Sequence, residues 1–193
     1  MKDYMAEAEI IYSSRKSLGL QVTQDGRLVV RAPFRMSRAE IEEFVREKSG
    51  WIEKHLERVS EEARTAEDEG ALSYEEIQQL ADKALKYIPE RVKYYAPLVG
   101  VTYGRITIRN QRSRWGSCSA EGNLNFNCLL MLTPPEVIDS VVVHELCHRL
   151  EMNHSDRFYR EVLRVFPDYY RWHAWLKENG GSLIRRMTAG AAR

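Results

Sequence analysis

Apolar and polar residues alternate with a period of two in the first part of the chain, which is the pattern of half-buried strands. The alternation covers residues 9–12, 17–23 and 27–32, and Asp25-Gly26 between the last two is typical of a tight turn. Pro33 follows, and proline cannot donate the backbone hydrogen bond that a continuing strand needs. We therefore predict an N-terminal β-meander.

The apolar pattern then changes to helical spacing, and two capping boxes predict where helices begin. Ser37 with Glu40, and Ser73 with Glu76, place a hydroxyl and a carboxylate three residues apart. At this spacing each side chain satisfies a free amide group of the first helical turn. Proline interrupts helical hydrogen bonding, so we expect two positions to bend or divide the second helix: Pro89 and Pro97.

Residues 60–70 separate the two predicted helices and are polar and acidic. This composition is typical of a solvated helix end or a hinge. We therefore predict an N-terminal part, residues 1–69, and a second domain, residues 70–193, with one compact unit as the alternative. A chain of 193 residues can bury a sizeable core in either arrangement.

The second half of the chain predicts a small sheet followed by a buried helix. Short strands are expected over residues 105–110, 114–119 and 123–128. Pro134-Pro135-Glu136 then has the composition of a helix start, and the residues up to 143 are mostly apolar. Strands and helices in this order predict an α+β fold.

The apolar helix ends in an H-E-x-x-H motif, residues 144–148. His144 and His148 are four residues apart, so their side chains lie on the same helix face and can share a cation, with Glu145 beside them. Two imidazoles and a carboxylate in a buried helix would be costly without partners. Zinc prefers imidazole ligands, and three protein ligands leave the fourth position open for catalysis.

His154 is the predicted third ligand. It lies ten residues after His144, too far to share a face of one straight helix, so the chain must turn. Asn153 is suited to a left-handed helix end and Ser155 to the N-cap of a following helix, which would place His154 in the corner between two helices. The alternative third ligands are two downstream glutamates: Glu161 and Glu178.

The histidine spacing equals that of the metzincins, but Glu151 occupies the position where that family needs glycine, and no convincing Met-turn follows. Other stretches carry a different likeness: R-W-G-S-C-S at 114–119, P-P-E-V-I-D at 134–139, V-V-V-H-E-L-C-H at 141–148 and M-N-H-S-D-R-F at 152–158. The chain resembles the YgjP-like metallopeptidases, predicted metal-dependent hydrolases related to minimal gluzincins and SprT-like proteins. The likeness spans most of the chain.

The resemblance implies a zincin-like metallopeptidase core, in which a small mixed sheet accompanies the H-E-x-x-H helix. It assigns the metal ligands to His144, His148 and His154, and the general base to Glu145. It also implies that one of the short strands is an edge strand above the metal, where it pairs with an extended peptide. Trp115 lies in such a strand, and a place in the core is the equal alternative for it.

These residues together predict a zinc-dependent metallopeptidase acting on a peptide or protein substrate. Zinc would activate a water molecule, and Glu145 would take its proton. The polar candidates for stabilising the oxyanion are Arg112, Arg114, Tyr169 and Tyr170. One alternative is a hydrolase of nucleotide phosphoanhydrides in which Arg112 and Arg114 clamp phosphate, and another is a DNA-associated protein of the SprT-like kind.

Composition adds little to this prediction. A net charge of +1 and a pI near 7.7 make nucleic acid an unexpected partner, and without a long apolar run we expect no membrane association and a cytoplasmic location. Cys118, Cys128 and Cys147 are odd in number and lack C-x-x-C spacing, which predicts free thiols. His173 is expected to pack among aromatic residues rather than bind metal, and no feature predicts a specificity pocket.

Overall fold

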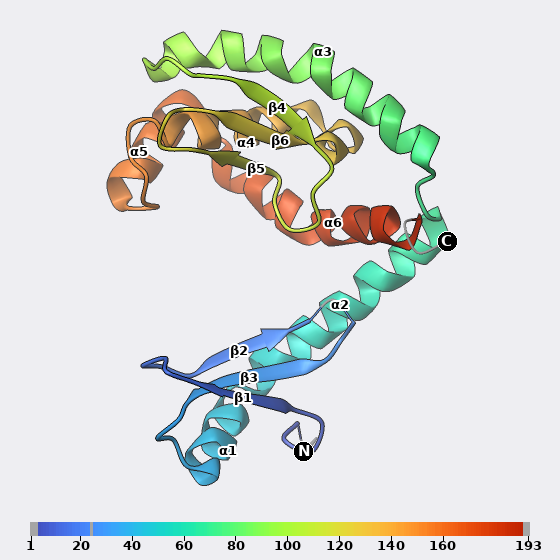
Figure 1. The fold of residues 1–193 in the computed structure, drawn as a ribbon, viewed down its shortest axis with the longest axis vertical. Coiled ribbons are helices and arrows are strands. Elements are labelled where there is room, and N and C mark those ends of the chain that lie inside the picture. The colour runs from blue at the N-terminus through green and yellow to red at the C-terminus, as the bar shows by residue number, and fades with distance from the viewer. Residues whose placement is uncertain (1–3, 24, 191–193) are drawn as a thin grey trace. The chain divides into compact units, whose positions relative to one another are not determined.

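A computed structural model describes residues 4–23 and 25–190, and they form the α+β fold that the sequence predicts (Figure 1). The chain forms two compact units, Met1–Thr65 and Ala66–Arg193, where the sequence suggested a boundary between residues 69 and 70. Among the described residues, no helix is both long enough and apolar enough to cross a membrane.

The first unit holds a three-stranded sheet of β1 (Glu9–Ser13), β2 (Gly19–Val22) and β3 (Leu28–Pro33). The strands lie where the sequence predicts them, but the predicted meander is wrong, because the order is β1-β3-β2 and β1 runs parallel to β3. Strand β3 is the most apolar of the three, and its Val30 and Ala32 are fully buried. A central position buries this strand better than an edge position would.

Two helices cover this sheet, α1 (Arg38–Glu47) and α2 (Ser49–Glu69). The predicted capping box of Ser37 and Glu40 begins α1. Lys48 caps α1 and separates it from α2. The apolar side chains still converge on β3 and form the core of this unit: Leu28, Val30, Ala32, Ile41, Val45 and Ile52.

In the second unit, α3 (Tyr74–Val99) begins at the predicted capping box of Ser73 and Glu76. The expectation that Pro89 and Pro97 divide this helix is wrong, since α3 continues through both. The helix packs along α4 and buries Leu80, Ala84, Ile88 and Val92, and this burial offsets the backbone hydrogen bonds that the prolines remove. Gly100, with a φ of 85°, ends the helix.

The sheet of the second unit is mixed, as predicted. It consists of β4 (Ile106–Arg109), β5 (Gly116–Cys118) and β6 (Leu124–Asn127) in the order β4-β6-β5. Strand β4 is parallel to β6, and β5 is antiparallel to it. In the part of the chain that the structure describes, β5 is therefore an edge strand with β6 as its one partner.

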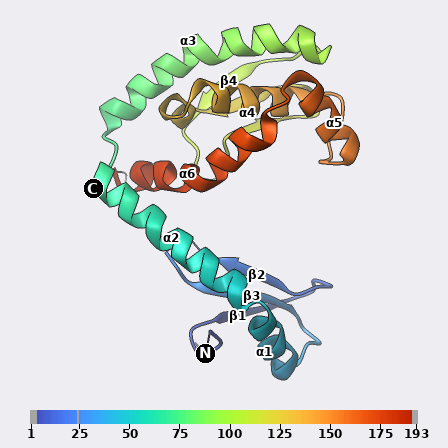
Figure 2. The ribbon, with the colours of Figure 1, turned by 180° about the vertical axis from the view of Figure 1, so that it is seen from behind.

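A short 3-10 helix, η1 (Cys128–Leu132), leads from the sheet into α4 (Pro135–Cys147), which lies between α3 and α6 (Figures 1 and 2). Helix α5 (Asp156–Val165) and helix α6 (Tyr169–Gly190) follow. Helix α6 continues through Asn179-Gly180-Gly181, a stretch whose composition is typical of a helix end. Gly180 stays within α6 because its bare α-carbon gives room to the indole ring of Trp115, so this glycine serves packing rather than helix termination.

Candidate metal centre

The end of α4 and the start of α5 position the three histidines. His144 lies in the last turn of α4 and His148 is its C-cap, while Ser155 caps α5 by accepting a hydrogen bond from the Phe158 amide at 3.3 Å. Asn153 does not have the predicted left-handed conformation, because glycines alone have a positive φ within residues 4–23 and 25–190. The helix already ends at Cys147, so an ordinary loop suffices to return the chain to His154.

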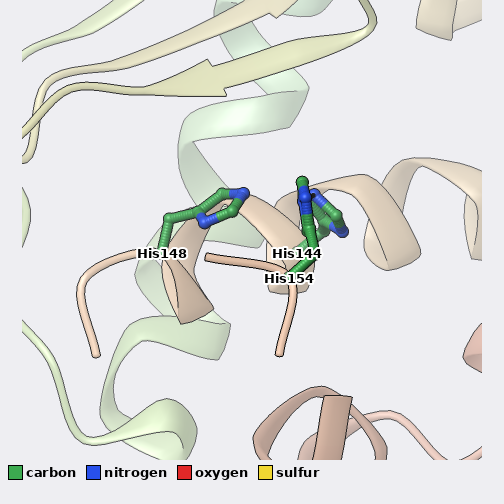
Figure 3. Close-up of side chains that lie close together, drawn as sticks. All are labelled: His144, His148 and His154. Carbon is green, nitrogen blue, oxygen red and sulfur yellow. Dashed lines mark hydrogen bonds between the residues drawn. The ribbon is translucent and has the colours of Figure 1, made fainter. Parts of the chain in front are cut away.

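The imidazole rings of His144, His148 and His154 converge (Figure 3), and their candidate ligand nitrogens all lie within 4.8 Å of one another. The Nε2 atoms of His144 and His154 are 3.0 Å apart. Two bare imidazole nitrogens repel at this distance unless a proton or a metal ion lies between them. On one tetrahedral zinc, with Zn–N bonds of about 2.05 Å, two nitrogens are about 3.3 Å apart.

The other ring nitrogens of His144 and His148 have partners that fix the orientation of each ring. Nδ1 of His148 is 3.2 Å from the carbonyl oxygen of Glu151, and because a carbonyl can only accept, Nδ1 donates and leaves Nε2 bare. Nδ1 of His144 is 2.8 Å from the hydroxyl of Tyr169, whose side chain is buried. Metal-binding histidines have such partners as a rule, so this donor set fits a metal ion.

The surroundings also keep the imidazoles of His144 and His148 neutral, which is the form that binds metal. Burial is the main cause that lowers the pKa of His144 to about 3, and the nearby His148, His154 and His173 contribute to the same shift. Burial lowers the pKa of His148 as well. Neutral rings with bare nitrogens can therefore receive a cation without first losing protons at neutral pH.

Glu145 is buried, with 5% of its surface exposed, and faces strand β5. Burial raises the pKa of its carboxyl group to about 8, against the weaker effect of the positive charge of Arg114. Its side chain lies against the backbone of Gly116, where no side chain intervenes. The closeness of Gly116 to another group was foreseeable from a glycine inside a strand, but its partner was not.

A cavity of about 250 Å³ opens beside His144 and Glu145. Residues 113–116 line one part of it, and residues of α4 and α6 line the rest. Of the predicted oxyanion contacts, Arg114 and Tyr169 line the cavity, whereas Arg112 and Tyr170 do not. No single stretch of the sequence signals this cavity, since its walls come from three separate segments.

The alternative third ligands lie apart from the histidines. Among the described residues, His144, His148 and His154 form the one cluster that could hold a metal ion, and neither Glu161 nor Glu178 is part of it. Glu161 instead accepts a hydrogen bond from Arg164 at 2.8 Å. His173 lines the cavity beside Tyr169 but is also outside the metal cluster.

A polar network anchors α4 and was not predicted from the sequence. Arg91 of α3 donates two hydrogen bonds to Asp139 of α4, at 2.7 and 2.8 Å, and the hydroxyl of Tyr95 donates a third at 3.1 Å. The carboxylate raises the pKa of Arg91, and burial beside it raises the pKa of Tyr95 to about 12. An aspartate within the mostly apolar stretch of residues 137–143 was the available signal.

Two overlapping stretches of the chain, residues 16–80 and 74–179, match the family described as "YgjP-like, metallopeptidase domain". The chain belongs to this family. The resemblance stated from the sequence is therefore confirmed, and the YgjP-like chain is a metal-dependent hydrolase.

Two solved structures are similar to the YgjP-like chain over about half of its length. The metallopeptidase zymogen abylysin from Pyrococcus abyssi is 22% identical, with a TM-score of 0.42, and covers 48% of this chain and 97% of its own. The metallopeptidase zymogen jannalysin from Methanocaldococcus jannaschii is 19% identical, with a TM-score of 0.42, and covers 47% and 94%. Among curated proteins, none matches the chain significantly in sequence.

Proposed function

We propose that this member of the YgjP-like family is a zinc-dependent peptidase. His144, His148 and His154 would hold the metal, and Glu145 would be the general base. The observation that carries this proposal is the convergence of three imidazoles within 4.8 Å next to a buried carboxylate. Three imidazole nitrogen ligands favour zinc over magnesium or calcium, which prefer oxygen.

When bound, zinc supplies Lewis acidity toward water and toward the carbonyl oxygen of a peptide bond. Glu145 takes the proton of the attacking water on its carboxylate. The protonated carboxyl group then passes this proton to the leaving amine. Tyr169 holds Nδ1 of His144, so its role is to orient a ligand, and Arg114 is the better candidate for the oxyanion.

The edge strand β5 supports a peptide as the substrate. Its Gly116 lies beside Glu145, and a peptide in extended conformation could add to the free side of β5 through main-chain hydrogen bonds. A phosphoanhydride hydrolase would need Arg112 and Arg114 together as a clamp for phosphate. Arg112 does not line the cavity, so the peptidase is favoured over the nucleotide hydrolase.

Hydrolysis by zinc-loaded protein tests the proposal, with an unfolded protein and a nucleoside triphosphate as the two substrates. We expect cleavage of the unfolded protein, no turnover of the nucleotide, and inhibition by a peptide hydroxamate. Glu145→Gln should keep its zinc and lose activity by about 10²-fold or more. The double variant Arg112→Ala, Arg114→Ala should still bind the hydroxamate. The peptidase proposal would be overturned if the protein hydrolysed the nucleotide but not the unfolded protein, and if the double variant lost that nucleotide hydrolysis.

A further inference from the structure

The cavity beside Glu145 has an apolar wall for which metal chemistry gives no reason. Trp115 reaches it from the segment before β5, Val141 from α4 and Leu176 from α6. His144 and Glu145 line the same cavity, so whatever occupies it lies next to the proposed reacting groups. An apolar cavity continuous with catalytic groups is the usual form of a substrate subsite.

Among the polar residues of the cavity, which also include Ser113, Tyr169 and His173, three are poor partners for a charged or amide side chain. The hydroxyl of Ser140 donates to the carbonyl of Val137 at 2.8 Å and is thereby satisfied within its own helix. A polar or charged side chain bonded to Glu145 would occupy the proposed base. Arg114 is exposed to solvent, where an ion pair contributes little.

The size of the cavity suits one side chain. Its volume is about 250 Å³, and an engineered apolar cavity of about 150 Å³ in another protein takes up benzene. One phenyl group or one branched aliphatic chain therefore fits, with some space to spare.

The Trp115 wall is held from behind. A β-carbon at Gly180 of α6 would lie 2.8 Å from Cζ2 of the Trp115 indole, so the ring is seated directly on the helix backbone. This close packing fixes the wall before any substrate arrives. A preformed cavity selects side chains by shape without a cost of ordering.

We propose that this cavity is a subsite for a single apolar side chain of aromatic size, adjacent to the bond that is cleaved in a peptide substrate. Phenylalanine is preferred there over glycine, aspartate and lysine. This inference rests on the proposed peptidase function and adds the class of substrate.

The binding step can be tested without turnover, because Trp115 is part of the wall. Amide probes with blocked ends, N-acetyl-phenylalaninamide and the glycine, aspartate and lysine equivalents, are titrated into metal-free and zinc-loaded protein. The indole N–H signals of the four tryptophans are followed by NMR, with Trp115→Phe to assign the signal. A saturable shift of the Trp115 signal is expected with the phenylalanine probe in both forms. Equal shifts with all probes, or none, would overturn the subsite.

Two variants on one helix separate the cavity from general packing. Leu176→Ala enlarges the cavity, whereas Leu183→Ala removes a leucine of α6 that is buried to the same degree and does not line it. In Leu176→Ala, the preference for a naphthylalanine probe over the phenylalanine probe should rise about tenfold. A selectivity of this size is what one methylene group in an apolar pocket typically provides. It should not change in Leu183→Ala, and an equal change in both variants would overturn the assignment.

Peptide cleavage distinguishes failure of the subsite from failure of the proposed function. Cleavage with equal rates for phenylalanine, glycine and aspartate at every position, without a shift of the Trp115 signal, would overturn the subsite and leave the peptidase standing. Absence of peptide cleavage by the zinc-loaded protein would overturn the proposed function, and with it the substrate role of the cavity.

Discussion

The α-carbon of Gly116 lies directly against the side chain of Glu145. A β-carbon at position 116 would be 2.6 Å from Oε1, 2.7 Å from Cγ and 2.9 Å from Cδ of the glutamate. Such contacts are too short for any side chain other than hydrogen. The position of the proposed base therefore depends on the absence of a side chain in the neighbouring strand.

Gly116→Ala should consequently lower hydrolysis by about 10²-fold, as for loss of a general base, while bound zinc stays near one per chain. Hydrolysis rates and metal content measure the two effects. Gly104→Ala is the matched control, since its β-carbon would meet the side chain of Asn123 at 2.7 Å, in the same unit. In a Glu145→Gln background, Gly116→Ala should cause no further loss, and a full additional loss would show that Gly116 acts elsewhere.

Removal of any one of His144, His148 and His154 should reduce bound zinc far below one per chain, because each supplies one of three proposed ligands. Alanine variants and metal analysis after dialysis test this. His173→Ala is the control and should retain its zinc, as His173 lines the cavity outside the ligand cluster. Full zinc content in His154→Ala would transfer the third position to another residue.

Tyr169→Phe should weaken zinc binding by about tenfold or more, since loss of the partner of a ligand histidine has an effect of this size. The variant removes the hydroxyl that lies 2.8 Å from Nδ1 of His144 and keeps the ring. Competition with a chelator measures the affinity. Tyr170→Phe changes the neighbouring tyrosine, which is exposed and outside the cavity, and should bind zinc normally. Equal affinities for both variants would argue against an orienting role for Tyr169.

Asp139→Ala should lower the free energy of unfolding by about 3 kcal/mol, because it leaves the Arg91 guanidinium and the Tyr95 hydroxyl without their shared partner between α3 and α4. Urea denaturation measures the change. Glu161→Ala removes the partner of Arg164 in a more exposed pair and should cost about 1 kcal/mol or less. Similar costs for the two variants would mean that the buried network contributes no more than a surface pair.

Features set by short spacings in the sequence were predictable. The capping boxes at Ser37 and Ser73 form as expected because each needs only two side chains within one helical turn. The H-E-x-x-H histidines share a face of α4 for the same reason. Ser155 caps α5 where the sequence places it. Local geometry decides these features, so the rest of the fold does not need to be known.

Features that depend on distant contacts were not predictable. Strand β1 pairs with β3 because β3 is the most buried strand, a fact of the folded core rather than of the turn at Gly26. Gly180 reads as a helix end in the sequence, yet it stays in α6 to make room for Trp115, which is 65 residues away. The contact of Gly116 with Glu145 and the apolar cavity likewise bring together separate segments of the chain. A single sequence does not indicate which of these distant residues lie in contact.

In the metal-free protein, the cost of ionising the buried carboxyl group of Glu145 should make the free energy of unfolding depend on pH. Burial raises the pKa of this carboxyl group from 4.5 to about 8, so the folded chain keeps a proton that the unfolded chain releases near pH 4.5. The contribution is thus fully present below pH 4.5 and is lost as the pH rises through about 8. Glu145→Gln cannot ionise and avoids this loss.

With a chelator present, the free energy of unfolding of Glu145→Gln should therefore rise relative to the unchanged protein between pH 4.5 and 8, by a few kcal/mol on the order-of-magnitude scale of such pKa shifts. His144 acts in the opposite direction: its lowered pKa stabilises the fold above pH 6.5, and this is lost as the pH falls toward 3. Both proteins contain His144, so its effect cancels in the difference. Urea unfolding at pH 4.5, 6 and 8 measures that difference. A difference that stays constant across this range would mean that ionising Glu145 does not destabilise the folded protein.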